Sequence, residues 1–446
     1  MIQQLIISAP NSNAGKTTIT LGLLRLLKRK NIAIQPFKVG PDYIDPKFHQ
    51  LACKKTGVNL DLFMMSEDEI NASLQHYGKD AQVNCIEGVM GLFDGAQKDK
   101  GSTAEMAKKL KTPVLMVIDA KAVAYSVAPL IQGFVNFDED VEIMGVVFNR
   151  VGSERHYTML KEACEDIKVP CFGYLPNLKS IEIPSRHLGL NISDIEKFDA
   201  LIDEIAIALD KTMDWKSILE ASKKVTPTTI AIQEPAVNKN KKFAVAKDEA
   251  FNFIYPQNIS AMEALGEIIY FSPLHDTELP DCDFVYLAGG YPEVYVKELS
   301  ENTAMLKSIK EFGLNNGQIY GECGGMMYLG KAIIDKDNEA FEMVNYFDFE
   351  TSIANKKLHL GYRTSTIGET VFKGHEFHYS SLVNDNETTI KTTITNARGG
   401  ETTTKIHKKN KVIGSYVHHY FGTSEKLLEL INLIDYLEES PEGIDK

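Results

Sequence analysis

Short runs of apolar residues recur along the first half of the chain, and segments with helical spacing separate them. The runs that predict strands are Gln4–Ala9, Ile32–Val39, Val83–Glu87, Val114–Asp119, Ile143–Phe148 and Cys171–Leu175. Between the first two runs, Thr18–Lys30 carries apolar residues at helical spacing. Several runs are continuous rather than alternating, which is typical of strands buried on both faces of a parallel sheet. The pattern predicts an α/β fold built from βαβ units.

A change in composition divides the chain into two parts. Residues Lys223–Lys242 are rich in Thr, Pro, Asn and Lys and show no apolar face, so we expect a linker there. Strand-like runs resume at Phe243–Ala246, Glu267–Phe271 and Phe284–Leu287. The amphipathic segment Ser424–Leu437 predicts a last helix that packs on the core. We therefore expect two α/β domains, residues 1–222 and residues 243–446.

Length and composition agree with two domains and argue against several classes of protein. The 446 residues exceed what one ordinary hydrophobic core holds. A net charge of −13 argues against a nucleic-acid partner, and no stretch approaches the roughly 18 apolar residues of a membrane helix. The first predicted strand begins close to Met1, which leaves no room for a secretory signal. The six cysteines lack paired spacing, so we expect reduced thiols in a cytoplasmic protein, without disulfides or a zinc site.

The segment between the first predicted strand and helix reads SAPNSNAGKTT and ends as a phosphate-binding loop does. We expect Gly15, Lys16, Thr17 and Thr18 to bind ATP. Backbone N–H groups at the helix N-terminus would hold phosphate oxygens, Lys16 would neutralise the β- and γ-phosphates, and Thr17 would hold Mg²⁺.

Two positions in this segment depart from related motifs. Pro10 stands where the motif has its first glycine, but the strand–loop–helix context favours a nucleotide site over an N-capped helix after a glycine turn. Asn11 stands where ParA- and MinD-type ATPases carry an additional lysine. The second departure argues against a dimerising ATPase switch.

Acidic residues follow the second and third predicted strands, in the loops FKVGPDYIDP (Phe37–Pro46) and CIEGVMGLFDG (Cys85–Gly95). Ligands of open α/β sheets bind at the carboxyl ends of strands, so both loops are expected near the phosphates. Glu87 ends its strand, where an acid holds Mg²⁺ directly or through water. Further acids within reach are Asp42, Asp45 and Asp94. Each alone fits a solvated loop carboxylate, but the cluster beside a phosphate loop indicates function. Lys38 fits either a bridge between phosphate and an acidic substrate or a plain surface lysine.

A cysteine in the second half lies at the tip of a predicted strand-to-helix turn, in the segment GQIYGECGGMMYLG (Gly317–Gly330). Glycines flank Cys323 on both sides, as in a thiol version of the nucleophile elbow. We expect the following helix to lower the pKa of Cys323 and the N–H of Gly324 to face a developing oxyanion. The other five cysteines lack this setting and are expected to be buried fillers.

Two further segments complete the expected thiol chemistry. The glycine turn LAGGYPE (Leu287–Glu293) is expected to donate a second oxyanion N–H around Gly290. A nucleophilic cysteine needs a base, and GSYVHHYFG near the C-terminus supplies His418 and His419.

Together these motifs resemble a known family. GECGGMMYLG, LAGGYPE and SYVHHYF are similar to a class I glutamine amidotransferase domain. With SAPNSNAGKTT, FKVGPDYIDP, EGVMGLFDG, IPSRHLGL (Ile183–Leu190) and GHEFHYS (Gly374–Ser380), the chain resembles the cobyrinate a,c-diamide synthase family. The resemblance covers nearly the whole chain, with the motifs in the same order.

The resemblance implies a dethiobiotin-synthetase-like ATP domain followed by a glutaminase domain. The first would use ATP and Mg²⁺ to phosphorylate a corrin carboxylate, and ammonia from glutamine would displace the phosphate at the a and c positions in turn. The family's nucleophile falls on Cys323 and its activating histidine on His418. The synthetase-site residues that the resemblance implies are Asp42, Tyr43, Asp45, Glu87 and Asp94.

Three positions differ from the family's pattern. Tyr420 stands where relatives often have a second histidine, and Ser185 stands where arginine is common. No glutamate follows His418 at the spacing of a Cys–His–Glu triad. Two alternatives stay open: the same reaction on hydrogenobyrinate or Ni-sirohydrochlorin, and a regulatory P-loop ATPase with an inactive glutaminase-like module. The oligomeric state is also open, with a homodimer as one alternative.

Overall fold

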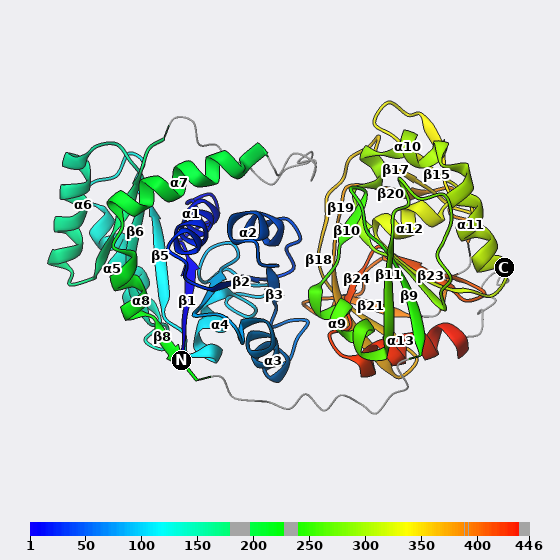
Figure 1. The fold of residues 1–446 in the computed structure, drawn as a ribbon, viewed down its shortest axis with the longest axis horizontal. Coiled ribbons are helices and arrows are strands. Elements are labelled where there is room, and N and C mark those ends of the chain that lie inside the picture. Colours follow the sequence, from blue (N-terminus) through cyan, green and yellow to red (C-terminus); the bar gives the residue numbers. More distant parts are fainter. Residues whose placement is uncertain (179–196, 227–239, 388, 391, 437–446) are drawn as a thin grey trace. The chain divides into compact units, whose positions relative to one another are not determined.

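A computed structural model of the chain describes residues 1–178, 197–226, 240–387, 389–390 and 392–436. The chain divides into two compact units, Met1–Ile232 and Gln233–Lys446, and each contains its own central sheet (Figure 1). Within the described ranges, no helix combines the length and the apolar composition needed to cross a bilayer.

The sheet of the first unit has eight strands. Their bounds are β1 (Ile2–Ser8), β2 (Ile34–Val39), β3 (Val58–Leu60), β4 (Val83–Glu87), β5 (Val114–Asp119), β6 (Ile143–Val151), β7 (Cys171–Pro176) and β8 (Lys223–Val225). Strands β3-β2-β4-β1-β5-β6-β7 lie in that order and are parallel, whereas β8 runs antiparallel to the start of β1. The predicted parallel sheet and its six predicted strands are confirmed. The strand order reverses beside β1, and such a switch point is where open α/β sheets bind ligands.

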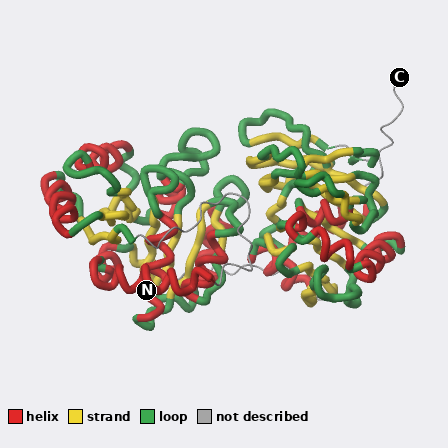
Figure 2. Tube along the Cα trace, turned by 90° about the horizontal axis from the view of Figure 1, so that it is seen from above, coloured by secondary structure: helices red, strands yellow, loops and turns green. Residues whose placement is uncertain are grey.

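Helices lie on both sides of this sheet (Figure 2). They are α1 (Lys16–Arg29), α2 (Asp45–Cys53), α3 (Glu67–Gly78), α4 (Thr103–Leu110), α5 (Val127–Phe137), α6 (Glu154–Asp166), α7 (Asp199–Thr212) and α8 (Trp215–Ala221). Helices α1 and α7 pack closely at Gly22, where a methyl group would lie 2.5 Å from Ile205 Cγ2 and 2.6 Å from Leu209 Cδ1. This contact fixes α1, which begins at the predicted phosphate loop.

The predicted linker is too wide at both ends. Residues Lys223–Val225 form β8, and their register places Val225 opposite Ile2, so they belong to the first sheet. Lys241 begins the first strand of the second unit. Polar residues hid β8 and the first two residues of β9 from the sequence pattern, because these lysines and Val225 are not buried.

The second unit contains several smaller sheets besides its main one. The main sheet has the order β11-β9-β12-β14-β23-β22, in which β22 alone is antiparallel to its neighbour. Its strands are β9 (Lys241–Ala246), β11 (Gly266–Phe271), β12 (Phe284–Leu287), β14 (Gln318–Glu322), β22 (Ile406–Lys409) and β23 (Val412–Ser415). The three strands predicted after the linker are confirmed as β9, β11 and β12.

The remaining strands surround the carboxyl edge of this sheet and its loops. An antiparallel sheet has the order β21 (Thr393–Asn396), β18 (His359–Ile367), β19 (Thr370–His378) and β24 (His418–Tyr420). A third has the order β16 (Ala340–Glu342), β15 (Ala332–Ile334), β17 (Glu350–Ser352) and β20 (Ser381–Val383). A short pair joins β10 (Phe251–Phe253) to β13 (Gly289–Gly290).

The helices of the second unit are α9 (Pro256–Leu265), α10 (Val296–Glu301), α11 (Thr303–Leu314), α12 (Gly324–Leu329) and α13 (Ser424–Tyr436), with a 3₁₀ turn at Pro292–Val294. The predicted C-terminal helix is confirmed as α13. Its residues Leu427, Leu430, Ile431 and Ile434 are buried in one apolar cluster with Met262 and Leu265 of α9.

The packing of α7 on α1 predicts an asymmetric response to truncation. Ile205 is fully buried, so Ile205→Ala should lower the free energy of unfolding of the first unit by about 2–5 kcal/mol. Ile207 lies on the same helix and is 43% exposed, so Ile207→Ala should change this free energy of unfolding by less than about 0.5 kcal/mol. Trp215, the one tryptophan of the chain, packs against this core and reports urea unfolding by fluorescence. Equal effects of both substitutions would contradict the packing.

Candidate active sites

The phosphate loop follows β1 and ends at Gly15, which adopts a left-handed conformation with φ 99°. A side chain cannot replace the hydrogen of this glycine, because its Cβ would lie 1.9 Å from Nδ2 of Asn149. Asn149 in turn donates a hydrogen bond to the carbonyl of Ala14 at 3.0 Å. The predicted strand–loop–helix context is therefore confirmed, and β6 supports the loop from one side.

The first turn of α1 carries the three polar side chains of the motif. Lys16 Nζ donates to the carbonyl oxygen of Asn11 at 3.3 Å and to that of Met90. Thr17 Oγ1 donates to Glu87 Oε1 at 2.7 Å, whereas Thr18 is half-buried on the same turn. Lys16 and Thr17 thus connect the loop to the chain segment that follows β4.

A buried ionic cluster lies beside Thr17. Lys38 Nζ is 2.6 Å from Asp45 Oδ2 and 3.0 Å from Glu87 Oε1, and His49 Nε2 lies 2.7 Å from Glu87 Oε2. Burial alone would raise the pKa of Glu87, but the charge of Lys38 and the hydrogen bonds of His49 and Thr17 outweigh it and hold that pKa well below its ordinary value. The surface-lysine interpretation of Lys38 is wrong, since its side chain is fully buried. Asp45 and Glu87 are also buried rather than solvated, because each carries a charge that Lys38 compensates.

The other predicted acids hold the loops around this cluster. Asp42 Oδ1 accepts hydrogen bonds from the N–H groups of Ile44 and Asp45 at 2.9 and 3.0 Å, so it shapes the turn into α2. Tyr43 is buried in that turn. Asp94 is exposed, as a solvated loop carboxylate would be, and accepts the N–H of Gly91 at 2.9 Å.

The donor atoms beside the phosphate loop suit Mg²⁺. Mg²⁺ prefers hard oxygen ligands and is commonly completed by substrate phosphates and water rather than by a protein cage. The hydroxyl of Thr17 and the carboxylate of Glu87 provide such oxygens side by side. Among the residues that the structure describes, no group of three or more His, Cys, Asp or Glu side chains could hold a metal alone. The pair therefore fits an ion that nucleotide phosphates would complete.

Cys323 lies between β14 and α12 with φ 46° and ψ −104°, a strained conformation for a residue with a side chain. Its N–H donates to the carbonyl of Ser415 at 2.7 Å, which ties the turn to β23. Position 325 requires glycine, because a Cβ there would lie 2.0 Å from the carbonyl oxygen of Leu287. The predicted strand–turn–helix elbow is confirmed.

The prediction that the following helix lowers the pKa of Cys323 is wrong. Burial, followed by the negative charge of Glu293, raises the pKa of Cys323 well above its ordinary value. A hydrogen bond from the N–H of Gly324 lowers the pKa but does not outweigh burial. The helix α12 has six residues, and the side chain of Cys323 is 3% exposed within an apolar cluster. The thiol is therefore protonated in the ligand-free molecule.

The two candidate bases have different surroundings. His419 is held by Tyr320, whose hydroxyl lies 2.6 Å from Nδ1, and by Ser365, whose hydroxyl lies 2.9 Å from Nε2. Burial, and then the charge of His418, lowers the pKa of His419 to about 3. Both ring nitrogens of His419 are thus used inside the fold, which favours His418 as the base.

Strand β13 brings His418 and the elbow together. A Cβ at Gly289 would lie 2.1 Å from His418 Cε1, and a Cβ at Gly324 would lie 3.1 Å from the backbone nitrogen of Gly290. His418 of β24 therefore borders Gly289, and the turn after Cys323 borders Gly290, the next residue of β13. The predicted oxyanion donors, Gly290 and Gly324, are neighbours in this arrangement.

Both units of the chain match known proteins. Residues 5–190 match the CobQ/CobB/MinD/ParA nucleotide binding domain, and residues 242–426 match the CobB/CobQ-like glutamine amidotransferase domain. The cobyrinate a,c-diamide synthase of Caldanaerobacter subterraneus subsp. tengcongensis is 42% identical, over 86% of this chain and 87% of its own. Those of Listeria monocytogenes and Salmonella typhimurium are 38% and 37% identical, over 94% and 95% of this chain and 96% of each relative. The chain belongs to the cobyrinate a,c-diamide synthase family.

Membership of this family confirms the predicted resemblance and the predicted α/β architecture of a nucleotide-binding domain followed by a glutamine amidotransferase domain. The motif IPSRHLGL, with Ser185, lies outside the described residues. His49 was missed from the sequence, although it lies one helical turn after Asp45 in α2. Also missed was the ion pair of Arg363 with Glu376, 2.5 Å long, although Glu376 lies in the motif GHEFHYS.

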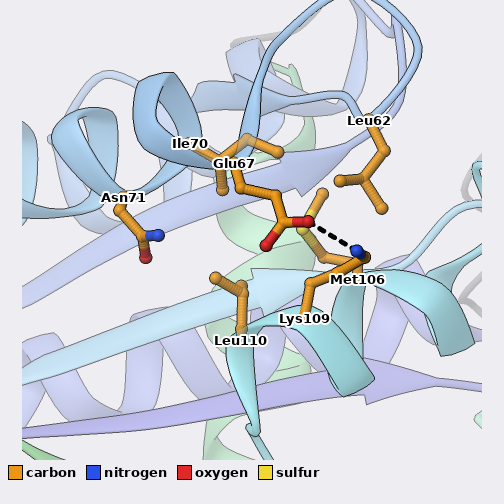
Figure 3. A pocket seen from close by; sticks show the side chains of 7 residues that line it. All are labelled: Leu62, Glu67, Ile70, Asn71, Met106, Lys109 and Leu110. Atoms are coloured by element: carbon orange, nitrogen blue, oxygen red, sulfur yellow. Dashed lines mark hydrogen bonds and ion pairs between the residues drawn. The ribbon is translucent and has the colours of Figure 1, made fainter.

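A small hollow in the first unit does not coincide with any of these sites (Figure 3). It lies between α3 and α4, and an ion pair of Glu67 with Lys109 crosses it. Its other lining residues are Leu62, Ile70, Asn71, Met106 and Leu110. None of the predicted site residues is among them, so the hollow belongs to neither of the two candidate sites.

The raised pKa of Cys323 predicts how the ligand-free thiols react. Alkylation requires the thiolate, so iodoacetamide should label Cys323 slowly near pH 7, with a rate that still increases above pH 9. Cys171 is the internal reference: it is partly exposed, and a hydrogen bond from Cys164 lowers its pKa to about 7. Peptide mass spectrometry after timed labelling should find Cys171 modified first. Preferential labelling of Cys323 near pH 7 would contradict this order.

Proposed function

We propose that this chain is an ATP- and glutamine-dependent ligase that converts the a and c carboxylates of cobyrinate to amides, as a step of cobalamin biosynthesis. One observation carries the proposal: a phosphate loop beside a buried acid cluster and a strained cysteine elbow occur in one chain. Relatives named for this reaction match the chain across both units. The cytoplasmic location and the oligomeric state stay predictions from the sequence.

The reaction of the first unit solves a leaving-group problem. A carboxylate does not react with ammonia because its oxygen leaves poorly, whereas a carboxylate oxygen that attacks the γ-phosphorus of ATP forms an acyl phosphate and releases ADP. Ammonia then attacks the acyl carbon, the carbon–oxygen bond to phosphate breaks, and the amide and phosphate result. Lys16 is the cation placed to neutralise charge on the transferred phosphoryl group.

The buried cluster is proposed to orient the reactants. Thr17 and Glu87 would hold Mg²⁺, which would neutralise phosphate charge when bound. Lys38, between Asp45 and Glu87, is positioned to exchange a carboxylate partner for a phosphate oxygen or the substrate carboxylate. Asp42, Tyr43 and Asp94 line the two neighbouring loops and are proposed to contact the corrin side of the substrate.

The second unit is proposed to supply the nitrogen. The thiol of Cys323 attacks the amide carbon of glutamine while its proton passes to His418. The N–H groups of Gly290 and Gly324 stabilise the oxyanion that forms. His418 then gives the proton to the leaving nitrogen, ammonia departs and a thioester remains. Water hydrolyses the thioester to glutamate, so one difficult step becomes two easier ones.

One experiment separates the candidate substrates. The protein is incubated with ATP, Mg²⁺ and glutamine together with cobyrinate, hydrogenobyrinate or Ni-sirohydrochlorin, and the products are weighed by mass spectrometry. Conversion of two carboxylic acids to amides in cobyrinate supports the proposal. Amidation of another macrocycle alone would reassign the substrate, and absence of glutamate release would favour the regulatory ATPase, against which Asn11 already argues.

The separation of the two chemistries predicts a selective loss. Cys323→Ala should reduce glutamine-dependent amidation by about a thousandfold or more, because no thioester can form. Amidation with a high concentration of ammonium should remain, since the acyl phosphate forms in the other unit. Cys282→Ala, a half-buried thiol in the same unit, serves as the matched control and should behave like the wild type. Failure of ammonium to restore the reaction would contradict two separate sites.

Removal of the phosphate-loop lysine should impair amidation but leave glutamate release intact. Lys16→Ala should reduce amidation by about a hundredfold or more with either nitrogen source, because phosphoryl transfer loses its cation. Glutamate release from glutamine should persist. Lys30→Ala, at the other end of α1, is the control because Lys30 pairs with Asp210 at the surface. Wild-type amidation by Lys16→Ala would remove the phosphate loop from the proposed reaction.

A further inference from the structure

No acid follows His418 at the spacing of a Cys–His–Glu triad, but an acid from another strand lies beside it. Tyr420, two residues after His418, packs edge-on against the ring of Tyr255 at a centroid distance of 5.8 Å. A carboxylate approaches His418 from β14 instead: Glu322 Oε2 is 3.8 Å from His418 Nδ1, and both side chains are buried. Glu322 directly precedes Cys323 in the chain.

Two hydrogen-bond donors fix the carboxylate of Glu322. The hydroxyl of Tyr286 donates to Oε2 at 2.7 Å, and the backbone N–H of His419 donates to Oε1 at 3.0 Å. Burial, together with the charge of Glu322, raises the pKa of Tyr286 well above its ordinary value, so this phenol remains a donor. Donors on both oxygens hold the carboxylate in one orientation.

A second histidine also confines the His418 ring. His375 of β19 stacks on it with a centroid distance of 5.1 Å and an interplanar angle of 22°. The hydroxyl of Tyr255 lies 3.1 Å from His375 Nδ1, and Gly289 leaves just enough room for the edge of the His418 ring. Burial, and then the charges of His418 and Arg363, lowers the pKa of His375 well below its ordinary value. His375 is therefore a neutral support.

Other titratable or charged groups around the ring are His378 and Arg363 of the sheet that contains β19, and the neighbouring His419. Burial is the main cause that lowers the pKa of His378 and that of His419 to about 3 in each case, so both stay neutral. Arg363 pairs with Glu376 at 2.5 Å. A positive charge that forms on His418 is thus best stabilised by Glu322.

We propose that Glu322 is the positioning acid of the cysteine–histidine site, an inference that rests on the proposed glutaminase function. The carboxylate holds the proton of His418 on Nδ1, so that Nε2 accepts the thiol proton of Cys323. It then stabilises the imidazolium until the proton passes to the leaving ammonia. The triad acid is thereby supplied from the strand that carries the nucleophile rather than from the segment after the histidine.

Two substitutions separate charge from shape. Glu322→Gln keeps the shape and removes the charge, and it should lower kcat of glutamate release by about tenfold or more. Glu322→Asp keeps the charge one methylene further away and should retain more activity than Glu322→Gln. Ammonium-dependent amidation should match the wild type in both because it needs only the first unit, and thermal unfolding followed by circular dichroism serves as the control for folding. The reverse order, with Glu322→Gln near the wild type and Glu322→Asp impaired, would overturn the proposal.

A double substitution tests whether Glu322 acts through His418. In a His418→Asn background, Glu322→Gln should cause no further loss. Additive losses would overturn the proposal. If Glu322→Gln does not fold, Tyr286→Phe, which removes one anchor of the carboxylate, should lower kcat in the same direction. A wild type without glutaminase activity would refute the proposed function instead.

Discussion

A charge that is buried without a partner costs several kcal/mol, and both chemical centres of this chain are arranged around that constraint. In the first unit, fully buried Lys38 lies between the carboxylates of Asp45 and Glu87. In the second, Glu322 faces His418 and is anchored by two donors. Removal of one member would leave its partner uncompensated in a low dielectric. The positions of these side chains are therefore fixed before any ligand arrives, which is the preorganisation that electrostatic catalysis needs.

The two centres lie at the same edge of their sheets but differ in the backbone conformation of their turns. Glu87 ends β4 and Glu322 ends β14, so each acid lies at the carboxyl edge of a parallel sheet, where the following loops leave room for a ligand. The loop of the first unit ends at Gly15 in a left-handed conformation, and the backbone N–H groups at the start of α1 would meet phosphate oxygens in the proposed site. The second tightens its turn at Cys323, which projects a single side chain from a strained residue. One geometry suits an anion with many oxygens, and the other suits one attacking atom.

The sequence pattern located most of the elements and the two turns, but not the surroundings of their side chains. The strands β4, β5 and β12 were predicted with the bounds that the structure gives them, because buried parallel strands are continuously apolar. Lys38 remained ambiguous, since one lysine at the end of a strand does not reveal which carboxylates come to it. His49 was missed because it belongs to a helix whose orientation toward Glu87 depends on how α2 packs. The thiol of Cys323 was assigned the wrong pKa because the sequence shows a turn and a helix start, but neither the burial of the sulfur nor the charge of Glu293.

The sequence alone determined most strands of the first sheet, the phosphate loop at Gly15–Thr17, the cysteine elbow and the family to which the chain belongs, because local spacing and short motifs encode these features. The family resemblance pointed to His418, but only the tertiary structure gave the physical reason, since His419 is held by Tyr320 and Ser365 while His418 faces Glu322. It also decided where the acid beside His418 comes from. The reason is that β14 and β23 pair in the parallel sheet, which brings Glu322 opposite Ser415 and so close to His418 three residues later. No periodicity along the chain records which strands become neighbours.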